Sequence, residues 1–131
     1  FETAVELEGW VGQMVQVFTN LYINALDACA SHGLDARLRT SCRPAIRDGR
    51  QGIELHIDDN GPGIETGDKE QIFEPLFTTK PRGEGTGLGL STVRQVIKRH
   101  EGEIDVSNQS VLGGARFVIW LPLKLTRLLP G

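Results

Sequence analysis

The chain has 131 residues, of which 39% are hydrophobic and 24% charged, the balance of one globular domain able to bury a core. Its formal net charge of −3 excludes a domain-wide field that would attract nucleic acid or an anionic membrane. No apolar run approaches the ~20 residues of a membrane span. We therefore expect contact with neither nucleic acid nor membrane, and any bound polyanion needs local donors.

The two cysteines, Cys29 and Cys42, form no CxxC pair, so we interpret both as small apolar residues of a reduced, cytoplasmic domain. The chain begins at Phe1, and its only methionine is Met14. We expect residues 1–131 to be a single domain of a longer protein, which leaves membrane anchoring of that parent open.

The N-terminal third predicts a long helix. Residues 3–8 alternate and are interpreted as a short edge strand, whereas residues 10–31 have helical periodicity. The expected apolar face consists of Val11, Met14, Val15, Phe18, Tyr22, Ala25 and Cys29. The opposite, polar stripe consists of Gln13, Gln16, Asn20, Asn24 and Asp27. His32 and Gly33 end the helix.

The remainder predicts paired strands separated by helices. Residues 36–42 and 52–58 are expected strands around a polar turn at Asp48, and Ile53, Leu55 and Ile57 share one face of the second. A glycine-rich turn (59–67), a helical turn (69–73) and a mobile loop (78–89) follow, then a helix (90–100), two strands (103–107 and 115–121) and a tail. Neighbouring strand pairs favour an α+β fold, a two-layer sandwich with helices on one face of a mixed sheet.

The glycine-rich segment Gly85-Thr86-Gly87-Leu88-Gly89-Leu90 leads directly into the last helix. Glycines let backbone amides approach a ligand closely, and a helix start carries unpaired N–H donors, so this segment suits phosphate. A flexible connector is the alternative interpretation. The preceding residues do not form a strand, and no Walker-type sequence occurs, which argues against a dinucleotide fold.

A second motif, Asp59-Asn60-Gly61-Pro62-Gly63-Ile64, follows the second strand. It is either a plain turn or a ligand site in which Asp59 accepts a hydrogen bond from an exocyclic amine. Because a carboxylate cannot donate, it suits the amino group of adenine better than the carbonyl of guanine. Gly61 and Gly63 would let a flat ring approach the backbone.

The polar stripe of the first helix is a solvated face or a metal site. Asn20 and Asn24 lie one helical turn apart, so their carboxamides can act together on Mg²⁺ and phosphates. We favour the solvated-face interpretation for Gln13 and Gln16.

The order of these motifs resembles the GHKL superfamily of ATP-binding domains, and within it the sensor histidine kinases. Residues 20–25 resemble the N box, 59–63 the G1 box, 73–77 the F box and 85–90 the G2 box, over about residues 8–122. The segment Phe77-Thr78-Thr79-Lys80 is most similar to kinases of the nitrogen-regulation and dicarboxylate-sensor type. The resemblance implies a Bergerat-type fold that binds ATP and Mg²⁺.

The resemblance also implies residue roles. Asp59 would bind the adenine amine, Asn24 would hold Mg²⁺, and Asn20 would lie beside the phosphates with Lys80 and Arg82 reaching them from the lid. Asn20, Asn24 and Lys80 are the expected catalytic residues. The expected nucleotide site comprises Asn20, Asn24, Asp27, Asp59, Gly61, Gly63, Ile64, Phe73, Phe77, Thr79, Lys80, Arg82, Gly85, Thr86, Gly87, Leu88, Gly89 and Leu90. Two positions depart from the family pattern, Glu101 in place of a glycine and Ala115 in place of a threonine, and we expect local effects only.

One position separates two enzyme classes of the superfamily. The hydrolytic members carry a glutamate general base one turn before the N-box asparagine, whereas this chain has Asn20, whose amide is not basic near pH 7. The resemblance therefore implies transfer of the γ-phosphoryl group to a histidine on a separate hairpin of the parent protein, with a response regulator downstream. We expect that hairpin to lie outside this chain, because His32, His56 and His100 do not follow the pattern of the phosphoacceptor segment.

Two alternatives stay open. The first is a serine/threonine kinase of the anti-sigma-factor type, against which the F box argues. The second is a nucleotide-sensing module without transfer, against which intact Asn24, Asp59 and Lys80 argue.

Overall fold

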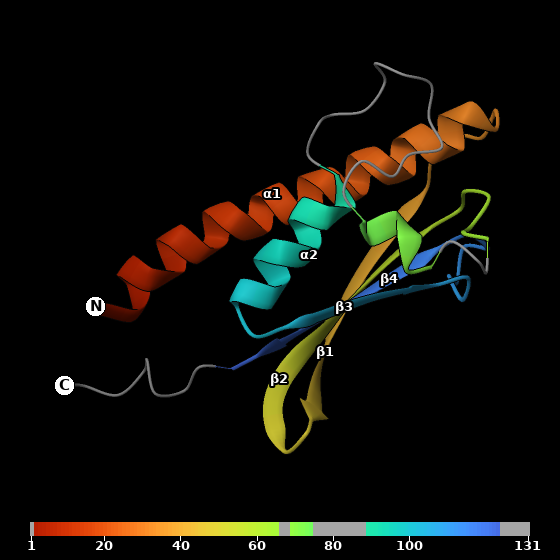
Figure 1. Cartoon of the computed structure of the whole chain (residues 1–131). Helices are drawn as coiled ribbons and strands as arrows, with labels where there is room; N and C mark the ends of the chain where they lie inside the picture. The colour runs from red at the N-terminus through yellow and green to blue at the C-terminus, as the bar shows by residue number, and fades with distance from the viewer. Residues whose placement is uncertain (1, 66–68, 75–88, 124–131) are drawn as a thin grey trace.

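The structure, a computed structural model, describes the backbone of residues 2–11 and both backbone and side chains of residues 12–65, 69–74 and 89–123. The elements in chain order are α1 (Glu2–Ser31), β1 (Leu38–Arg47), β2 (Arg50–Asp59), the 3-10 turn η2 (Gln71–Phe73), α2 (Leu90–Arg99), β3 (Glu103–Ser107) and β4 (Arg116–Pro122) (Figure 1).

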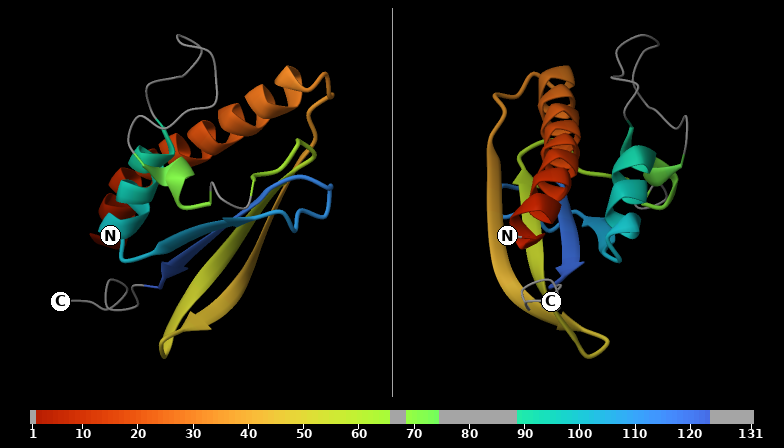
Figure 2. Two further views of the ribbon diagram at one scale, coloured as in Figure 1. Left: turned by 45° about the vertical axis from the view of Figure 1, so that its right-hand side comes forward. Right: turned by 90° about the vertical axis from the view of Figure 1, so that its left-hand side faces the viewer.

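The strands form one sheet in the order β1-β2-β4-β3, and the two helices lie together on one side of it (Figures 1 and 2). This confirms the predicted two-layer α+β sandwich. Each of the three pairings between the described strands is antiparallel, so the expected mixture of parallel and antiparallel pairs does not occur among them.

The core lies between the helices and the inner face of the sheet. From α1 it takes Met14, Val17, Leu21 and Ala25, with Cys29 buried at the C-terminal end of the helix. These positions repeat at steps of three and four, as a helix that buries one stripe requires. Val15 was expected on this face, but its side chain is 57% exposed, so that assignment was wrong. The buried face of α1 instead includes Val17 and Leu21.

The edge strand expected at residues 3–8 is also wrong, because α1 is helical from Glu2 onward. The segment contains Glu2, Ala4, Glu6, Leu7 and Glu8, which are good helix formers. No proline separates it from the periodic residues that follow, so the helix continues through a short alternating stretch.

The β1–β2 hairpin is longer than the sequence predicted. Its two-residue turn, Asp48-Gly49, has positive φ at both positions (50° and 77°), the geometry of the tight hairpin turns that match strand twist. Pairing therefore extends from Arg47↔Arg50 at the turn to Leu38↔Asp59 at the other end. This extension carries Asp59 to the last paired position of β2.

The departure at Glu101 has a conformational consequence. Glu101 follows the C-terminus of α2 with φ of 62°, the left-handed conformation that glycine adopts without strain. The next residue, Gly102, has no space for a side chain, because a Cβ there would meet the carbonyl oxygen of Trp120. Packing therefore requires glycine at position 102, whereas position 101 accommodates glutamate.

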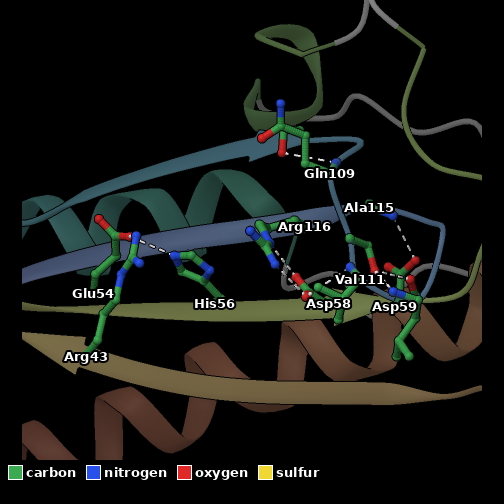
Figure 3. A network of polar contacts seen from close by, with 12 residues as sticks. Arg43, Glu54, His56, Asp58, Asp59, Gln109, Val111, Ala115 and Arg116 are labelled. Carbon is green, nitrogen blue, oxygen red and sulfur yellow. Dashed lines mark hydrogen bonds and ion pairs between the residues drawn. The ribbon is translucent and has the colours of Figure 1, made fainter.

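The outer face of the sheet carries a charged network around Glu54, whose side chain is 13% exposed. Glu54 accepts hydrogen bonds from His56 Nε2 at 2.6 Å and Arg43 at 2.9 Å (Figure 3). It accepts a third from Arg47 at 3.3 Å. These contacts, the one from His56 above all, lower the pKa of the Glu54 carboxyl from 4.5 to about 2. Trp120 lies on the same face, against Gly52 and below the Arg47 guanidinium.

This network predicts a pH-dependent contribution to stability. Because the folded-state pKa of Glu54 is depressed, its stabilisation is complete above pH 4.5 and is lost as the pH falls through about 2. Glu54→Gln removes up to about 3 kcal/mol of unfolding free energy at neutral pH and much less near pH 2. Urea unfolding across this range measures the difference. The exposed Glu65→Gln is the control, and a Glu54→Gln deficit that did not shrink with acidification would contradict the assignment.

Candidate functional site

The C-terminal end of β2 places a buried carboxylate in the glycine-rich turn. Asp59 is 6% exposed, and its Oδ1 accepts hydrogen bonds from the amides of Gly61 at 2.9 Å and Ala115 at 3.0 Å (Figure 3). No hydrogen bond reaches Oδ2 from the residues that the structure describes. Two amides therefore fix the orientation of the carboxylate, and its second oxygen remains available to a donor.

The backbone of Asp59 is held by the loop between β3 and β4. Its carbonyl oxygen accepts hydrogen bonds from Ser110 Oγ at 2.6 Å and from the Gly114 amide at 3.0 Å, while its amide donates to the Ala115 carbonyl at 3.0 Å. Gly114 lies so close that a Cβ there would meet Asp59 Oδ1, the Asp59 carbonyl and the Gly61 nitrogen. Only glycine allows this approach.

The side chain of Asn60 ties the turn to the segment that follows α1. Its Oδ1 accepts hydrogen bonds from the Arg37 amide at 2.7 Å and the Cys29 thiol at 3.2 Å, and its Nδ2 donates to the Asp35 carbonyl at 2.9 Å. Burial raises the pKa of the Cys29 thiol, which keeps it protonated as the donor.

The far end of the turn is held by Asn108. Its Oδ1 accepts from the Ile64 amide at 2.7 Å, and its Nδ2 donates to the Ile64 carbonyl at 2.6 Å. Gly63, with φ of 82°, packs under this pair, because a Cβ there would meet the Asn108 side chain. Asp59, Gly61, Gly63 and Ile64 thus lie on one turn that is braced at both ends.

The polar stripe of α1 is partly buried. The Asn20 side chain is buried, with 7% of the residue exposed. Its Nδ2 has no hydrogen-bond partner within the part of the chain that the structure describes. Asn24 and Asp27 are half-buried. The C-terminal end of α1 reaches the turn, since a Cβ at Gly61 would lie 3.6 Å from Cys29 Sγ and 3.7 Å from the Ala28 side chain.

The F-box and G2-box residues are only partly described. Phe73 is buried in η2, edge-on to Phe117 with ring centroids 6.4 Å apart, and the Arg94 guanidinium lies 5.4 Å from its ring. Gly89 immediately precedes α2, and half-buried Leu90 begins the helix, so the predicted glycine-to-helix junction is present. The predicted positions Phe77, Thr79, Lys80, Arg82, Gly85, Thr86, Gly87 and Leu88, and most of the expected mobile loop, lie outside the described residues.

The described residues include a surface groove beside the predicted site but no cluster of metal-binding side chains. They contain no group of three or more His, Cys, Asp or Glu side chains arranged to hold a metal ion. A surface groove of about 710 Å³ between η2 and α2, lined by Phe73, Ser91, Arg94, Gln95, Lys98 and Arg99, shares only Phe73 with the predicted site. None of the described helices is both long and apolar enough to cross a membrane.

Sequence reasoning missed the residues that support Asp59. Ala115 was expected to have local effects only, yet its amide donates directly to the Asp59 carboxylate. Ser110 and Asn108 carried no signal, because a single polar residue in a loop does not reveal its partner. Gly114, beside a second glycine and just before a strand, was the one recognisable hint of a close backbone approach.

Residues 11–125 match the family model described as histidine kinase-, DNA gyrase B-, and HSP90-like ATPase. The chain belongs to this family. Among solved structures, it is similar to the catalytic domain of histidine kinase ThkA, with a TM-score of 0.67 and 32% identity over 85% of this chain and 66% of that one.

Curated relatives are sensor kinases. The chain is 38% identical over 127 residues to the sensor histidine kinase ZraS of Escherichia coli O157:H7, which covers 96% of this chain and 25% of that protein. It is 43% identical over 118 residues to the two-component sensor PprA of Pseudomonas aeruginosa, covering 89% of this chain and 12% of that protein. The chain therefore spans a quarter or less of the length of these relatives.

The close approach at Gly114 gives a direct test of the site geometry. Gly114→Ala lowers the free energy of unfolding by about 1–3 kcal/mol, since the added methyl overpacks against the Asp59 carboxylate and its backbone. Urea unfolding measures the change. Gly12→Ala, on α1 with open space around its Cβ, is the control and raises stability by about 0.5–1 kcal/mol. Equal stability of the two variants would contradict the geometry.

Proposed function

We propose that the chain is the catalytic ATP-binding domain of a sensor histidine kinase and that Asp59 is its adenine-recognition residue. The observation that carries the proposal is the buried Asp59 carboxylate, with Oδ1 fixed by two amides and Oδ2 left to a donor. An acceptor-only group in this position selects the exocyclic amine of adenine and disfavours the carbonyl of guanine. We assign Gly61 and Gly63 to the same ring by the order of the motifs alone, because the Cβ positions of both glycines are already packed against protein atoms.

The phosphates would lie toward α1 and the start of α2. The Nδ2 of Asn20, which has no hydrogen-bond partner among the described residues, suits a phosphate oxygen, and the half-buried Asn24 carboxamide offers an oxygen of the type Mg²⁺ prefers. Bound Mg²⁺ would neutralise charge on the phosphates. We assign Lys80, Arg82 and the amides of residues 85–89 to the same phosphates by the order of the motifs. Asp27 and Thr79 belong to the same nucleotide site, and Phe73 and Phe77 would pack the base of the lid.

The reaction we propose is phosphoryl transfer rather than hydrolysis. Hydrolysis needs a base to activate water, and the position of that base in hydrolytic members is occupied here by the non-basic Asn20. The bound γ-phosphoryl group would therefore pass to a histidine imidazole nitrogen on a hairpin of the parent protein, with ADP leaving. The domain contributes positioning and charge neutralisation.

This function implies its partners and location. ATP and ADP bind here, the phosphoacceptor hairpin belongs to the same protein, and a response regulator receives the phosphate afterwards. We place the domain in the cytoplasm, where ATP is available and where the free thiols Cys29 and Cys42 stay reduced. We assign it no contact with nucleic acid or membrane.

Nucleotide choice tests the adenine assignment. ATP and ADP bind, GTP binds much more weakly, and Asp59→Asn loses about 1.5–3 kcal/mol of ATP-binding free energy, as expected when a charged acceptor becomes a neutral amide. Calorimetry measures each affinity. Asp105→Asn, which removes an exposed carboxylate on β3, is the control and keeps wild-type affinity. Unchanged ATP affinity in Asp59→Asn would remove Asp59 from the adenine site.

Phosphate transfer tests the reaction. The isolated domain releases negligible phosphate from labelled ATP, but it labels a separately produced hairpin of the parent protein, and a chelator that removes Mg²⁺ abolishes the labelling. The product is acid-labile and base-stable, as a phosphoramidate is.

Other outcomes of this experiment identify the alternatives. Rapid phosphate release without labelling would make the domain an ATPase. An acid-stable product on serine or threonine would identify the anti-sigma-factor type of kinase. Tight ATP binding with neither release nor labelling would identify a nucleotide sensor.

A further inference from the structure

The residue before Asp59 is a second buried carboxylate that points to the opposite face of β2. Asp58 is 2% exposed and forms a two-pronged ion pair with Arg116, with Nε 2.7 Å from Oδ1 and a terminal guanidinium nitrogen 2.9 Å from Oδ2 (Figure 3). Oδ2 also accepts a hydrogen bond from the Val111 amide at 3.3 Å. These contacts, chiefly those from Arg116, lower the pKa of the Asp58 carboxyl, so the pair stays ionised near neutral pH.

The loop between β3 and β4 is therefore fastened to both faces of β2. On the outer face, Val111 and Arg116 bind the Asp58 carboxylate. On the inner side, Ser110 and Gly114 bind the Asp59 carbonyl, and Ala115 binds the Asp59 carboxylate. The residues that bind Asp58 and those that bind Asp59 are interspersed along this short segment. Val111 and Arg116, which bind Asp58, therefore lie on either side of Ala115 in the sequence.

From this arrangement we propose that Arg116, through its ion pair with Asp58, is a positioning residue for nucleotide binding. The pair holds residues 110–116 against β2, so that the Ala115 amide fixes Oδ1 of Asp59 and leaves Oδ2 aimed at the adenine amine. This inference rests on the proposed function, because it assigns Arg116 a role only if Asp59 binds adenine.

A second charged cluster on the same face separates this role from general stabilisation of the sheet. The Glu54 cluster with Arg43, Arg47 and His56 also lies on the outer face of β2, and its hydrogen bonds do not reach the described residues that bond to Asp59. Loss of that cluster weakens the sheet without loosening the segment around Ala115. Glu54→Gln is therefore a matched control.

The test is ADP affinity of this chain, measured by calorimetry well below the unfolding temperature of every variant. Arg116→Lys keeps the positive charge but loses the planar fork. It binds ADP about tenfold more weakly, in line with measured couplings within one hydrogen-bond network. Glu54→Gln binds ADP as the wild type does. Ser110→Ala, which removes only the hydroxyl on the Asp59 carbonyl, weakens ADP binding severalfold.

A double-mutant cycle shows whether Arg116 affects ADP affinity through Asp59 or independently of it. In the Asp59→Asn background, where the charged acceptor for adenine is gone, Arg116→Lys changes ADP affinity less than about twofold, because the two changes act through one contact. NMR titration reaches the weak affinities involved. Effects of Arg116→Lys that simply add to those of Asp59→Asn would overturn the proposal.

The remaining outcomes keep the two proposals apart. Wild-type protein that binds no ADP would refute the proposed function itself. Wild-type ADP binding that is unchanged by Arg116→Lys would overturn the role of Arg116 and leave the adenine assignment intact. If Arg116→Lys does not fold, unchanged affinity in Ser110→Ala would overturn the proposal.

Discussion

The burial of the Asp59 carboxylate at the end of β2 is the constraint on which the site depends. An ionised carboxylate costs several kcal/mol to remove from water unless hydrogen bonds replace its hydration. Two backbone amides supply that replacement on one oxygen. Because these amides belong to segments more than fifty positions apart in the sequence, the carboxylate organises the tertiary structure around it as well as the turn itself.

This constraint explains why small residues and short polar side chains gather here. Gly61 and Gly114 bring backbone close to the carboxylate, where a Cβ at Gly114 would collide with it. The side chains of Asn60 and Asn108 each accept from a backbone N–H and donate to a backbone C=O of another segment. They satisfy backbone groups that a neighbouring strand would satisfy within a sheet. The turn is therefore rigid without belonging to the sheet, as a preorganised binding site requires.

The sequence predicted local features well and long-range partners poorly. The β2 face, the helix starting at Leu90 and the Asp48-Gly49 turn follow from periodicity and turn chemistry, and the structure has them. The strand expected at residues 3–8 and the buried position expected at Val15 were wrong. Six alternating residues fit a strand or a helix equally, and a shift of the apolar face around the helix buries Val17 instead of Val15. The candidate site was recognisable from motif order, but the contacts of Ser110, Asn108 and Arg116 exist only after folding brings distant segments together.

Asn20 shows why a polar residue can be buried on a helix that otherwise packs a core. Its Nδ2 has no acceptor among the described residues, and an unpaired buried donor costs about 1–3 kcal/mol of folding free energy. A leucine there would avoid that cost, so stability alone does not account for the amide. A ligand oxygen that accepts from Nδ2 recovers the lost hydrogen bond only in the bound state. In the proposed site, part of the cost of burying Asn20 would then be returned as binding free energy, and bound nucleotide would stabilise the folded domain.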